Sequence, residues 1–206
     1  MNKQQAHWEN VYQTKAPDTV SWFQEHATRS LQLIRSIDQA ANAQIIDIGG
    51  GASTLVDDLL ASGFKHVSVL DLSESALQLA RSRLGSLAPH VTWIAGDITT
   101  VELPAHAYDI WHDRAVFHFL TDPADRMAYV RQVMKTVKPG GHVIVAAFAP
   151  DGPEQCSGLP VTRYDHDQLH NEFGTAFELL EHSKEGHMTP WGSVQHFVYC
   201  HCLTPH

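Results

Sequence analysis

Cysteine and long apolar runs are scarce in this sequence. Its three cysteines, Cys156, Cys200 and Cys202, are odd in number and form no Cys-x-x-Cys pair, which argues against a disulfide framework and a structural zinc site. No apolar run approaches the roughly 18 residues that span a membrane, and no secretory pattern is present. We therefore expect a cytoplasmic protein with reduced thiols and no membrane partner.

Positive charge is also in short supply. Fourteen Lys and Arg residues stand against 23 Asp and Glu residues, so the net charge is −9 at pH 7. A surface of that sign repels phosphate backbones, which argues against nucleic acid as a substrate. Fifteen histidines are spread along the chain without a His-Glu-x-x-His motif, and we expect no metal site.

The sequence does contain an ordinary balance of core and surface residues. Hydrophobic residues make up 43% and charged residues 18% of the 206 positions. A chain of this length can bury a substantial core without disulfides or metals. We expect one domain over residues 1–206.

The chain is organised around the segment Ile45-Ile46-Asp47-Ile48-Gly49-Gly50-Gly51. Its β-branched residues indicate a buried strand, its glycines permit a tight turn close to a ligand, and residues 52–62 are predicted to form a helix. A dinucleotide site would have a third glycine where Thr54 stands. Instead, Asp47 precedes Gly49 by two residues, and a carboxylate at a strand end suits a cationic ligand.

This Asp-x-Gly-x-Gly form resembles the first motif of the class I S-adenosylmethionine-dependent methyltransferases. The resemblance extends from the glycine turn to Phe148, through a helix, a Lys138-Pro139-Gly140-Gly141 turn and an apolar strand. It implies S-adenosylmethionine as cofactor and S-adenosylhomocysteine as its product. It also implies that Asp47 and the glycines Gly49, Gly50 and Gly51 lie near the methionine part of the cofactor.

Two further strand ends are predicted to hold the nucleoside. Strand 66–71 ends in Asp71, at the spacing from the glycine turn at which a Rossmann-like unit presents an acid to ribose hydroxyls, and Leu72 follows it. A helix cap is the alternative role for Asp71, although Ser73 already offers one. The resemblance implies that Asp97 holds the adenine amino group and that Ile98 flanks the ring; an ordinary turn aspartate is the alternative.

The order of elements predicts an α/β protein. Similar crossovers between apolar strands favour a parallel sheet with helices on both faces. The resemblance implies a three-layer α/β/α sandwich, with a mostly parallel seven-stranded sheet and an antiparallel last strand. Within the domain we expect a helical cap over residues 1–40, a cofactor-binding core over 41–148, and a substrate-side loop with the C-terminal strands over 149–206.

Polar residues interrupt an apolar run at the end of the fourth strand, where open α/β sheets bind ligands. We expect Asp113 and His118 to position the acceptor or serve as base, Asp113 also to touch the cofactor, and Arg114 to bind the acceptor. The alternatives are an Asp113–Arg114 ion pair that braces the loop and a buried, hydrogen-bonded His118.

The proline- and glycine-rich loop 149–164 has the length of a binding loop. We expect Arg163 to act in catalysis by pairing with a carboxylate of the acceptor or the cofactor, and Cys156 and Tyr164 to contact the acceptor. Filling space is the alternative role for Cys156.

Aromatic residues gather before the first strand. Trp8, Tyr12 and Trp22 suit a helical lid that excludes water from the site, with Trp22 contacting the acceptor. The alternative is that they anchor the N-terminal segment on the domain surface.

Together these features predict methyl transfer from S-adenosylmethionine to nitrogen, oxygen or sulfur of a small molecule. The alternatives are a protein lysine N-methyltransferase and a binding protein without turnover. A closed pocket beneath Trp8, Trp22 and the Cys156 loop would favour a small acceptor, whereas an exposed acidic groove would favour a basic peptide.

Overall fold

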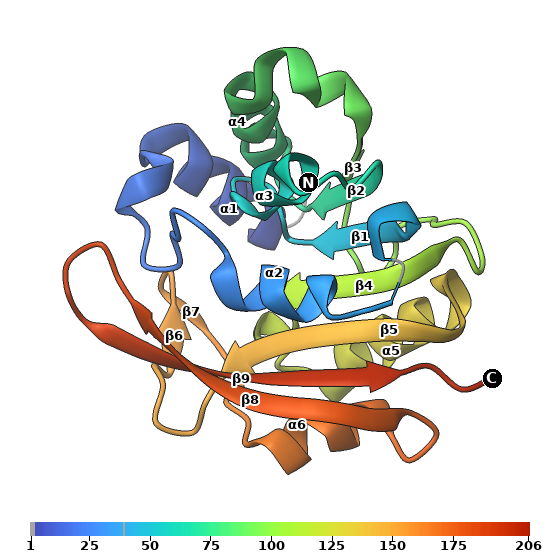
Figure 1. Cartoon of the computed structure of the whole chain (residues 1–206). Coiled ribbons are helices and arrows are strands. Elements are labelled where there is room, and N and C mark those ends of the chain that lie inside the picture. Colours follow the sequence, from blue (N-terminus) through green and yellow to red (C-terminus); the bar gives the residue numbers. More distant parts are fainter. Residues whose placement is uncertain (1–2, 39) are drawn as a thin grey trace.

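A computed structural model describes residues 3–38 and 40–206 (Figure 1). Seven strands form one sheet in the order β3-β2-β1-β4-β5-β9-β8. β1 to β5 run parallel, and β9 runs antiparallel to both β5 and β8, which confirms the predicted fold class. The strands are β1 (Gln44–Ile48), β2 (His66–Asp71), β3 (Val91–Ala95), β4 (Tyr108–Arg114), β5 (Val137–Phe148), β8 (Glu178–Met188) and β9 (Val194–Leu203).

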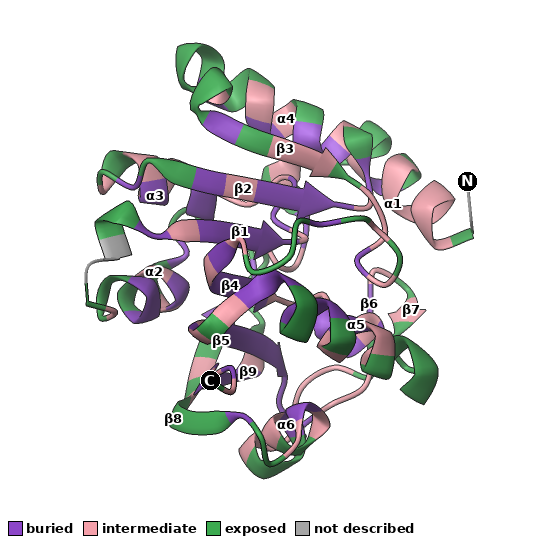
Figure 2. Cartoon of the chain, turned by 90° about the vertical axis from the view of Figure 1, so that its right-hand side faces the viewer, coloured by how far each residue is buried: buried purple, intermediate pink, exposed green. Residues whose placement is uncertain are grey.

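Helices cover both faces of this sheet (Figures 1 and 2). One face carries α2 (Thr28–Arg35), α3 (Leu55–Ala61) and α4 (Glu74–Leu84), and the other carries α5 (Pro123–Thr136) and α6 (His166–Phe173). α1 (Lys3–Thr14) packs against α4. The 3-10 helices are η1 (Pro17–Thr19), η2 (Ala40–Asn42), η3 (Gly85–His90) and η4 (Phe117–Phe119). No helix within the described ranges is long and apolar enough to cross a membrane.

The core consists of two apolar layers separated by the sheet. Successive side chains of a strand point to opposite faces, and in β5 Val143 and Val145 join the layer of α5 and α6, whereas Ile144 and Ala146 join that of α2, α3 and α4. This two-sided burial explains the continuous apolarity of β5 and its interior position in the sheet (Figure 2).

Several boundaries differ from those predicted. α3 begins at Leu55 rather than at residue 52, because the chain before it forms a turn closed by a hydrogen bond from Ser53 N–H to the Gly50 carbonyl. The sequence predicts a strand over residues 177–182, whereas β8 continues to Met188. The loop after β5 contains a short hairpin, β6 (Gln155–Cys156) and β7 (Leu159–Pro160).

Candidate cofactor and acceptor site

The glycine turn after β1 is shaped by contacts within the protein. Gly49 has a φ of 68°, in the left-handed region, and its N–H donates to the Leu70 carbonyl over 2.7 Å. A Cβ at Gly49 would lie 2.0 Å from Val116 Cγ2, and one at Gly51 would lie 2.5 Å from Asp71 Oδ2. Close packing against Val116 and Asp71 therefore leaves no room for a side chain at these two positions.

Asp71 ends β2 with its carboxylate against this turn. Oδ2 accepts the Gly51 N–H at 3.0 Å and Oδ1 accepts the Ser73 N–H at 2.8 Å. Each carboxylate oxygen has two lone pairs, so each keeps one for a ligand. Burial raises the pKa of Asp71 to about 6, against the lowering effect of these two N–H groups. The group is therefore an anion at neutral pH.

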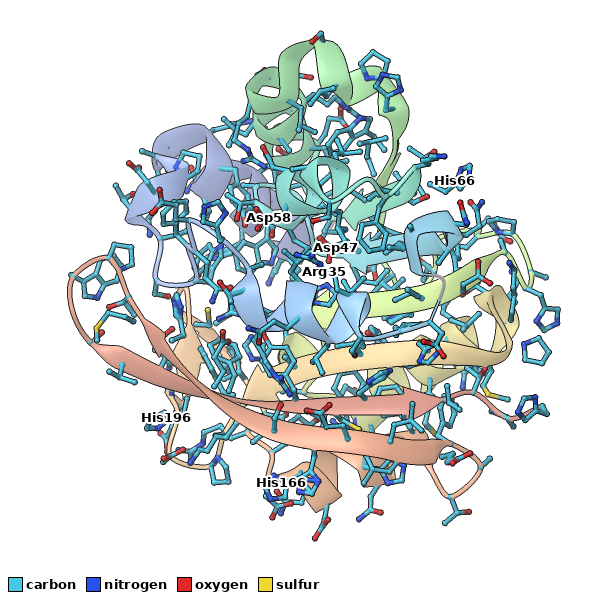
Figure 3. The ribbon with its side chains drawn as sticks, viewed as in Figure 1. Arg35, Asp47, Asp58, His66, His166 and His196 are labelled. Carbon is cyan, nitrogen blue, oxygen red and sulfur yellow. The ribbon has the colours of Figure 1, made fainter. Side chains whose placement is uncertain are left out.

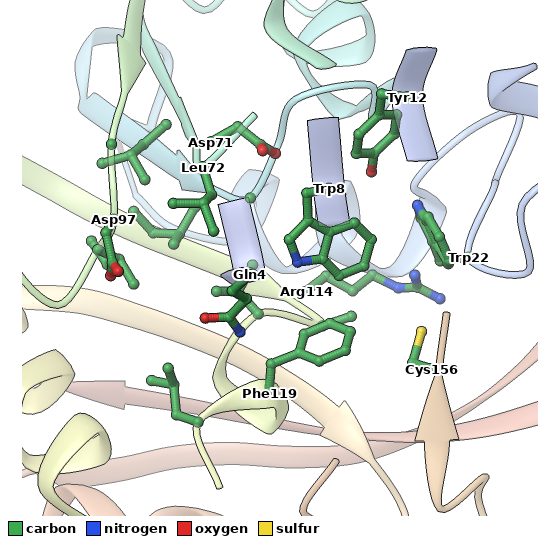
Figure 4. A pocket seen from close by; sticks show the side chains of 18 residues that line it. Gln4, Trp8, Tyr12, Trp22, Asp71, Leu72, Asp97, Arg114, Phe119 and Cys156 are labelled. Carbon is green, nitrogen blue, oxygen red and sulfur yellow. The ribbon is translucent and has the colours of Figure 1, made fainter. Parts of the chain in front are cut away.

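A cavity opens beside these residues at the carboxyl ends of β1 to β4 (Figure 4). Its lining includes residues that were predicted to bind the cofactor and others that were predicted to contact the acceptor: Gly49, Asp71, Leu72, Asp97, Ile98, Trp22, Arg114 and Cys156.

Asp97 has a local role as well as a place in the cavity wall. Its Oδ1 accepts hydrogen bonds from the Thr99 N–H at 2.9 Å and the Thr99 hydroxyl at 2.7 Å. Asp97 therefore both stabilises its own turn and lines the cavity.

A second hollow adjoins the first, and the two share Tyr12, Trp22, Ile48, Gly49 and Arg114. The second is lined by Gly50, by Asp47 and by residues of the segment between α1 and α2. We refer to these two adjoining hollows together as the groove; Asp71 and Asp97 line the first hollow, whereas Asp47 and Gly50 line the second.

Asp47 lies in this second hollow with one oxygen bonded and one without a partner. Its Oδ1 lies 2.6 Å from His112 Nδ1, and His112 Nε2 lies 2.8 Å from Ser30 Oγ. Oδ2 is buried and has no hydrogen-bond partner among the described residues; a Cβ at Gly50 would lie 2.2 Å from it. A buried carboxylate oxygen of this kind is suited to a ligand that brings a donor.

Helix α1 forms the outer wall of the cavity through Gln4, Trp8 and Tyr12. The Trp8 ring meets those of Trp22 and Phe119 edge to face, with centroids 5.6 and 5.2 Å apart (Figure 4). Such pairs add stabilisation beyond burial of their area. The N-terminal aromatic residues thus pack over the site.

A polar contact docks the same helix on the start of α4. The Glu9 carboxylate accepts the Glu74 N–H at 2.7 Å and the Ser75 N–H at 3.2 Å. These N–H groups belong to the first turn of α4, where no intrahelical acceptor exists. Glu9 therefore ties α1 to the element that follows Asp71.

Arg114 lines both hollows at the end of β4. Its Nε donates to Tyr199 Oη at 3.2 Å, and its Nη2 lies 3.3 Å from Glu185 Oε2. The guanidinium carbon sits 4.1 Å from the centroid of the Phe197 ring. The predicted ion pair with Asp113 is not formed, since Glu185 of β8 takes that place.

Cys156 reaches the cavity from the β6–β7 hairpin and is buried. Burial raises the pKa of its thiol to about 12, so it stays protonated at neutral pH. A protonated thiol is a poor nucleophile, and Cys156 serves as a soft, apolar part of the wall.

Comparison with known proteins agrees with this geometry. Residues 45–141 match the family of methyltransferase domains. The fold resembles that of the N-methyltransferase NodS from Bradyrhizobium japonicum, solved with S-adenosylhomocysteine, with a TM-score of 0.72 and 17% identity over 97% of this chain and 100% of that one. Residues 45–141 therefore match a methyltransferase domain, and the chain as a whole shares the fold of the class I S-adenosylmethionine-dependent methyltransferases.

Curated relatives of this chain act on different acceptors, as their names state. Malonyl-[acyl-carrier protein] O-methyltransferase of Halalkalibacterium halodurans is 35% identical over 52% of this chain and 40% of its own length. Human EEF1A lysine methyltransferase 2 is 24% identical over 85% of this chain and 74% of its own length. The chain spans between 19% and 44% of the length of the first three curated relatives.

Asp113 lies outside the lining of both hollows. Its fully buried carboxylate accepts the Val116 N–H at 2.8 Å, the Phe117 N–H at 3.1 Å and the Tyr129 hydroxyl at 2.7 Å. Burial raises its pKa to about 6, opposed first by the Tyr129 hydrogen bond. Its position fits a brace for the turn that sets Val116 against Gly49, and not the predicted catalytic and cofactor roles.

The other predicted catalytic residues also lie outside the lining. His118 is buried between Phe119 and Phe148, and burial lowers its pKa to about 3. Arg163 donates to the carbonyls of Pro150 and Gly152 and thus fixes its own loop.

Tyr164, predicted to contact the acceptor, is likewise absent from the lining of both hollows. It is buried against Phe117 within the layer of α5 and α6. Polar residues in an apolar run show that a site is near, but not which of them point into it.

Some histidines pair with one another: His142 Nδ1 lies 2.9 Å from His201 Nε2, and the rings of His166 and His182 have centroids 4.2 Å apart. His66, His166 and His196 lie on separate parts of the molecule (Figure 3). Within residues 3–38 and 40–206, no group of three or more His, Cys, Asp or Glu side chains could hold a metal ion.

Proposed function

We propose that this methyltransferase transfers the methyl group of S-adenosylmethionine to a small-molecule acceptor. The observation that carries the proposal is that two adjoining hollows are lined by acids from three strand ends, by an aromatic wall and by Arg114. The bound cofactor supplies a methyl group already activated by its sulfonium. The protein has to align the acceptor with it and exclude water.

The residues of the groove suit each part of the cofactor. The free lone pairs of Asp71 would accept the ribose hydroxyls, and Asp97 would accept from the adenine amino group beside Leu72 and Ile98. The unpartnered Oδ2 of Asp47 would accept from the ammonium of the methionine part.

The acceptor end supports a small molecule over a peptide. Trp8, Trp22 and Cys156 all line the cavity, so α1 and the β6–β7 hairpin enclose it. α1 would act as the lid that keeps water from the reacting atoms.

A protein lysine methyltransferase is the second candidate. It is favoured by the human relative, whose similarity extends over 85% of the chain. The enclosing aromatic wall and the guanidinium of Arg114 oppose it, because a lysine side chain would bring a second cation next to Arg114.

Radiolabelled cofactor, incubated with the enzyme and fractionated cell extract, tests the proposal. We expect label in the small-molecule fraction, and an Asp71→Ala variant should lose both labelling and S-adenosylhomocysteine binding in calorimetry. Label confined to protein would favour the lysine alternative. Binding of S-adenosylhomocysteine without any labelled product would indicate a binding protein.

A further inference from the structure

The acids that line the groove are already engaged. Asp47 is paired with His112, Asp71 accepts two backbone N–H groups, and Asp97 accepts from Thr99. Under the proposed function, their remaining lone pairs hold the cofactor. Among the described residues that line the groove, no carboxylate is left to remove a proton from an acceptor.

The remaining titratable groups of the lining are no better as bases. Burial raises the pKa of the Tyr12 hydroxyl far above its ordinary value, and the Cys156 thiol also keeps its proton. His112 has Nδ1 against Asp47 and Nε2 against Ser30. An acceptor in this groove therefore has to be nucleophilic without help from a protein base.

Arg114 is the one Lys or Arg among the described residues that line the groove. Figure 4 shows its guanidinium ending between Trp22 and Cys156. Nε and Nη2 contact Tyr199 and Glu185, whereas Nη1 donates to no described residue. A guanidinium that lines this space with one nitrogen unbonded favours an anion.

The groups around Arg114 come from β8 and β9. Glu185 offsets part of its charge at 3.3 Å, and Tyr199 accepts from Nε. His187 of β8 lines neither hollow, lies 2.7 Å from the Ser21 carbonyl through Nε2, and has its pKa lowered by burial first and by Arg114 second. None of these groups presents a base to the groove, and the free N–H of Arg114 remains.

The walls beside Arg114 select among anions. Trp8, Trp22, Phe119 and Cys156 are aromatic or soft apolar surfaces. Removing a compact carboxylate from water costs far more than removing a large, polarisable sulfur anion, and sulfur packs well against aromatic rings. The thiolate is also the reactive form of a thiol.

We infer that the acceptor is a small apolar thiol that enters as its thiolate and is held by Nη1 of Arg114. The inference rests on the proposed function and names its substrate class. A lone pair of the thiolate sulfur forms the bond to the methyl carbon, while the carbon–sulfonium bond breaks and its electron pair stays on the cofactor sulfur. One anion and one cation become two neutral thioethers, and the thiol proton has passed to water before binding.

A series of thiols of similar shape and graded acidity tests this assignment. kcat/KM is measured against pH for para-nitrothiophenol, thiophenol and phenylmethanethiol. We expect the midpoint of the pH profile to move from thiol to thiol with the acidity of each one. One midpoint shared by all three would mean that an enzyme group titrates, and would overturn the inference.

Other acceptor chemistries form the second arm. Benzoate and aniline are offered in the same radiolabel assay. Preferred transfer to either one, or no transfer to any thiol by enzyme that binds S-adenosylhomocysteine, would overturn the thiol assignment and leave cofactor binding intact. Loss of S-adenosylhomocysteine binding itself would instead contradict the proposed function.

Variants of Arg114 supply the third arm. Arg114→Met should lower kcat/KM for thiophenol roughly 10- to 100-fold, because a charge-assisted hydrogen bond is lost, and Arg114→Lys should restore part of it. The matched control is Arg131→Met, at an exposed position on α5. If Arg114→Met weakened S-adenosylhomocysteine binding as much as it lowers kcat/KM, Arg114 would serve the cofactor and the inference would fall.

Discussion

A single carboxyl group, that of Asp71, sets how the nucleoside end of the groove responds to pH. Its pKa is raised to about 6, and ribose hydroxyls donate best to the ionised form. We expect S-adenosylhomocysteine affinity to fall as the pH drops through about 6, while the empty protein gains stability from protonation of this group between there and its unfolded value of 3.8. Calorimetric titration with S-adenosylhomocysteine at a series of pH values checks this. The Asp71→Asn variant should bind weakly, with an affinity that depends less on pH. An unchanged dependence of affinity on pH in that variant would contradict the assignment.

His112 is a positioning residue at the other end of the groove. Its Nδ1 holds Asp47 Oδ1 at 2.6 Å, so His112→Ala leaves a buried carboxylate without its partner. We expect S-adenosylhomocysteine affinity to fall by about 1–3 kcal/mol, with partial rescue in His112→Asn, whose amide can still donate. Calorimetry measures the S-adenosylhomocysteine affinity of this variant beside that of the control His90→Ala, at an exposed position. Equal affinities in wild type and His112→Ala would show that His112 does not position Asp47 for the ligand.

The residues that sequence could identify are those whose neighbours lie close along the chain. Asp47 and Asp71 lie in the last residues of β1 and β2, and Asp97 lies just after β3, each within a recognisable motif. The structure brings Asp71 and Asp97 into one cavity and Asp47 into the adjoining hollow. His112 could not be assigned, because its partners Asp47 and Ser30 are far from it in sequence.

At the scale of elements, the glycine turn holds β1, β2 and the turn after β4 together. Gly49→Ala would place a side chain at positive φ and 2.0 Å from Val116, and we expect a loss of roughly 2–4 kcal/mol in the free energy of unfolding. Urea denaturation measures it. The double variant Gly49→Ala, Val116→Ala should recover the steric part only; no recovery would mean that backbone strain accounts for the whole loss.

Helix α1 should respond to ligand because it forms the outer wall of the groove. A ligand beneath it stabilises the docked state by mass action, so we expect S-adenosylhomocysteine to slow tryptic cleavage after Lys15. Glu9→Ala removes the contact with the start of α4 and should speed cleavage without ligand. Mass spectrometry measures the cleavage rates. Equal rates with and without ligand would mean that α1 does not respond to ligand in the site.

The spacing of hydrophobic residues predicts whether a segment forms a helix or a strand. The residues at which a helix or strand ends depend instead on contacts with distant parts of the chain. β2 occupies the predicted residues 66–71, since alternation and flanking turns are local signals. β8 runs past its predicted end because pairing with β9 continues to Met188, which no property of its own residues indicates.

At the scale of the whole molecule, binding should raise thermal stability. The sheet separates two apolar layers, and the groove lies at the ends of its strands. A ligand bound there therefore links elements that pack in both layers. S-adenosylhomocysteine at about 100 times its Kd should add about 2.7 kcal/mol and raise Tm by roughly 5–10 °C for a domain of this size. Differential scanning fluorimetry checks this, with Asp71→Ala as the variant that should show no shift.

The packing of α1 over the site predicts which step limits the rate of turnover. Spent nucleoside would leave only after Trp8 separates from Trp22 and Phe119, so undocking would follow every chemical event. Rapid mixing should then reveal a burst of one methylated product per enzyme followed by a slower steady phase. Weakening the Trp8 contacts should quicken that second phase and leave the burst amplitude in place.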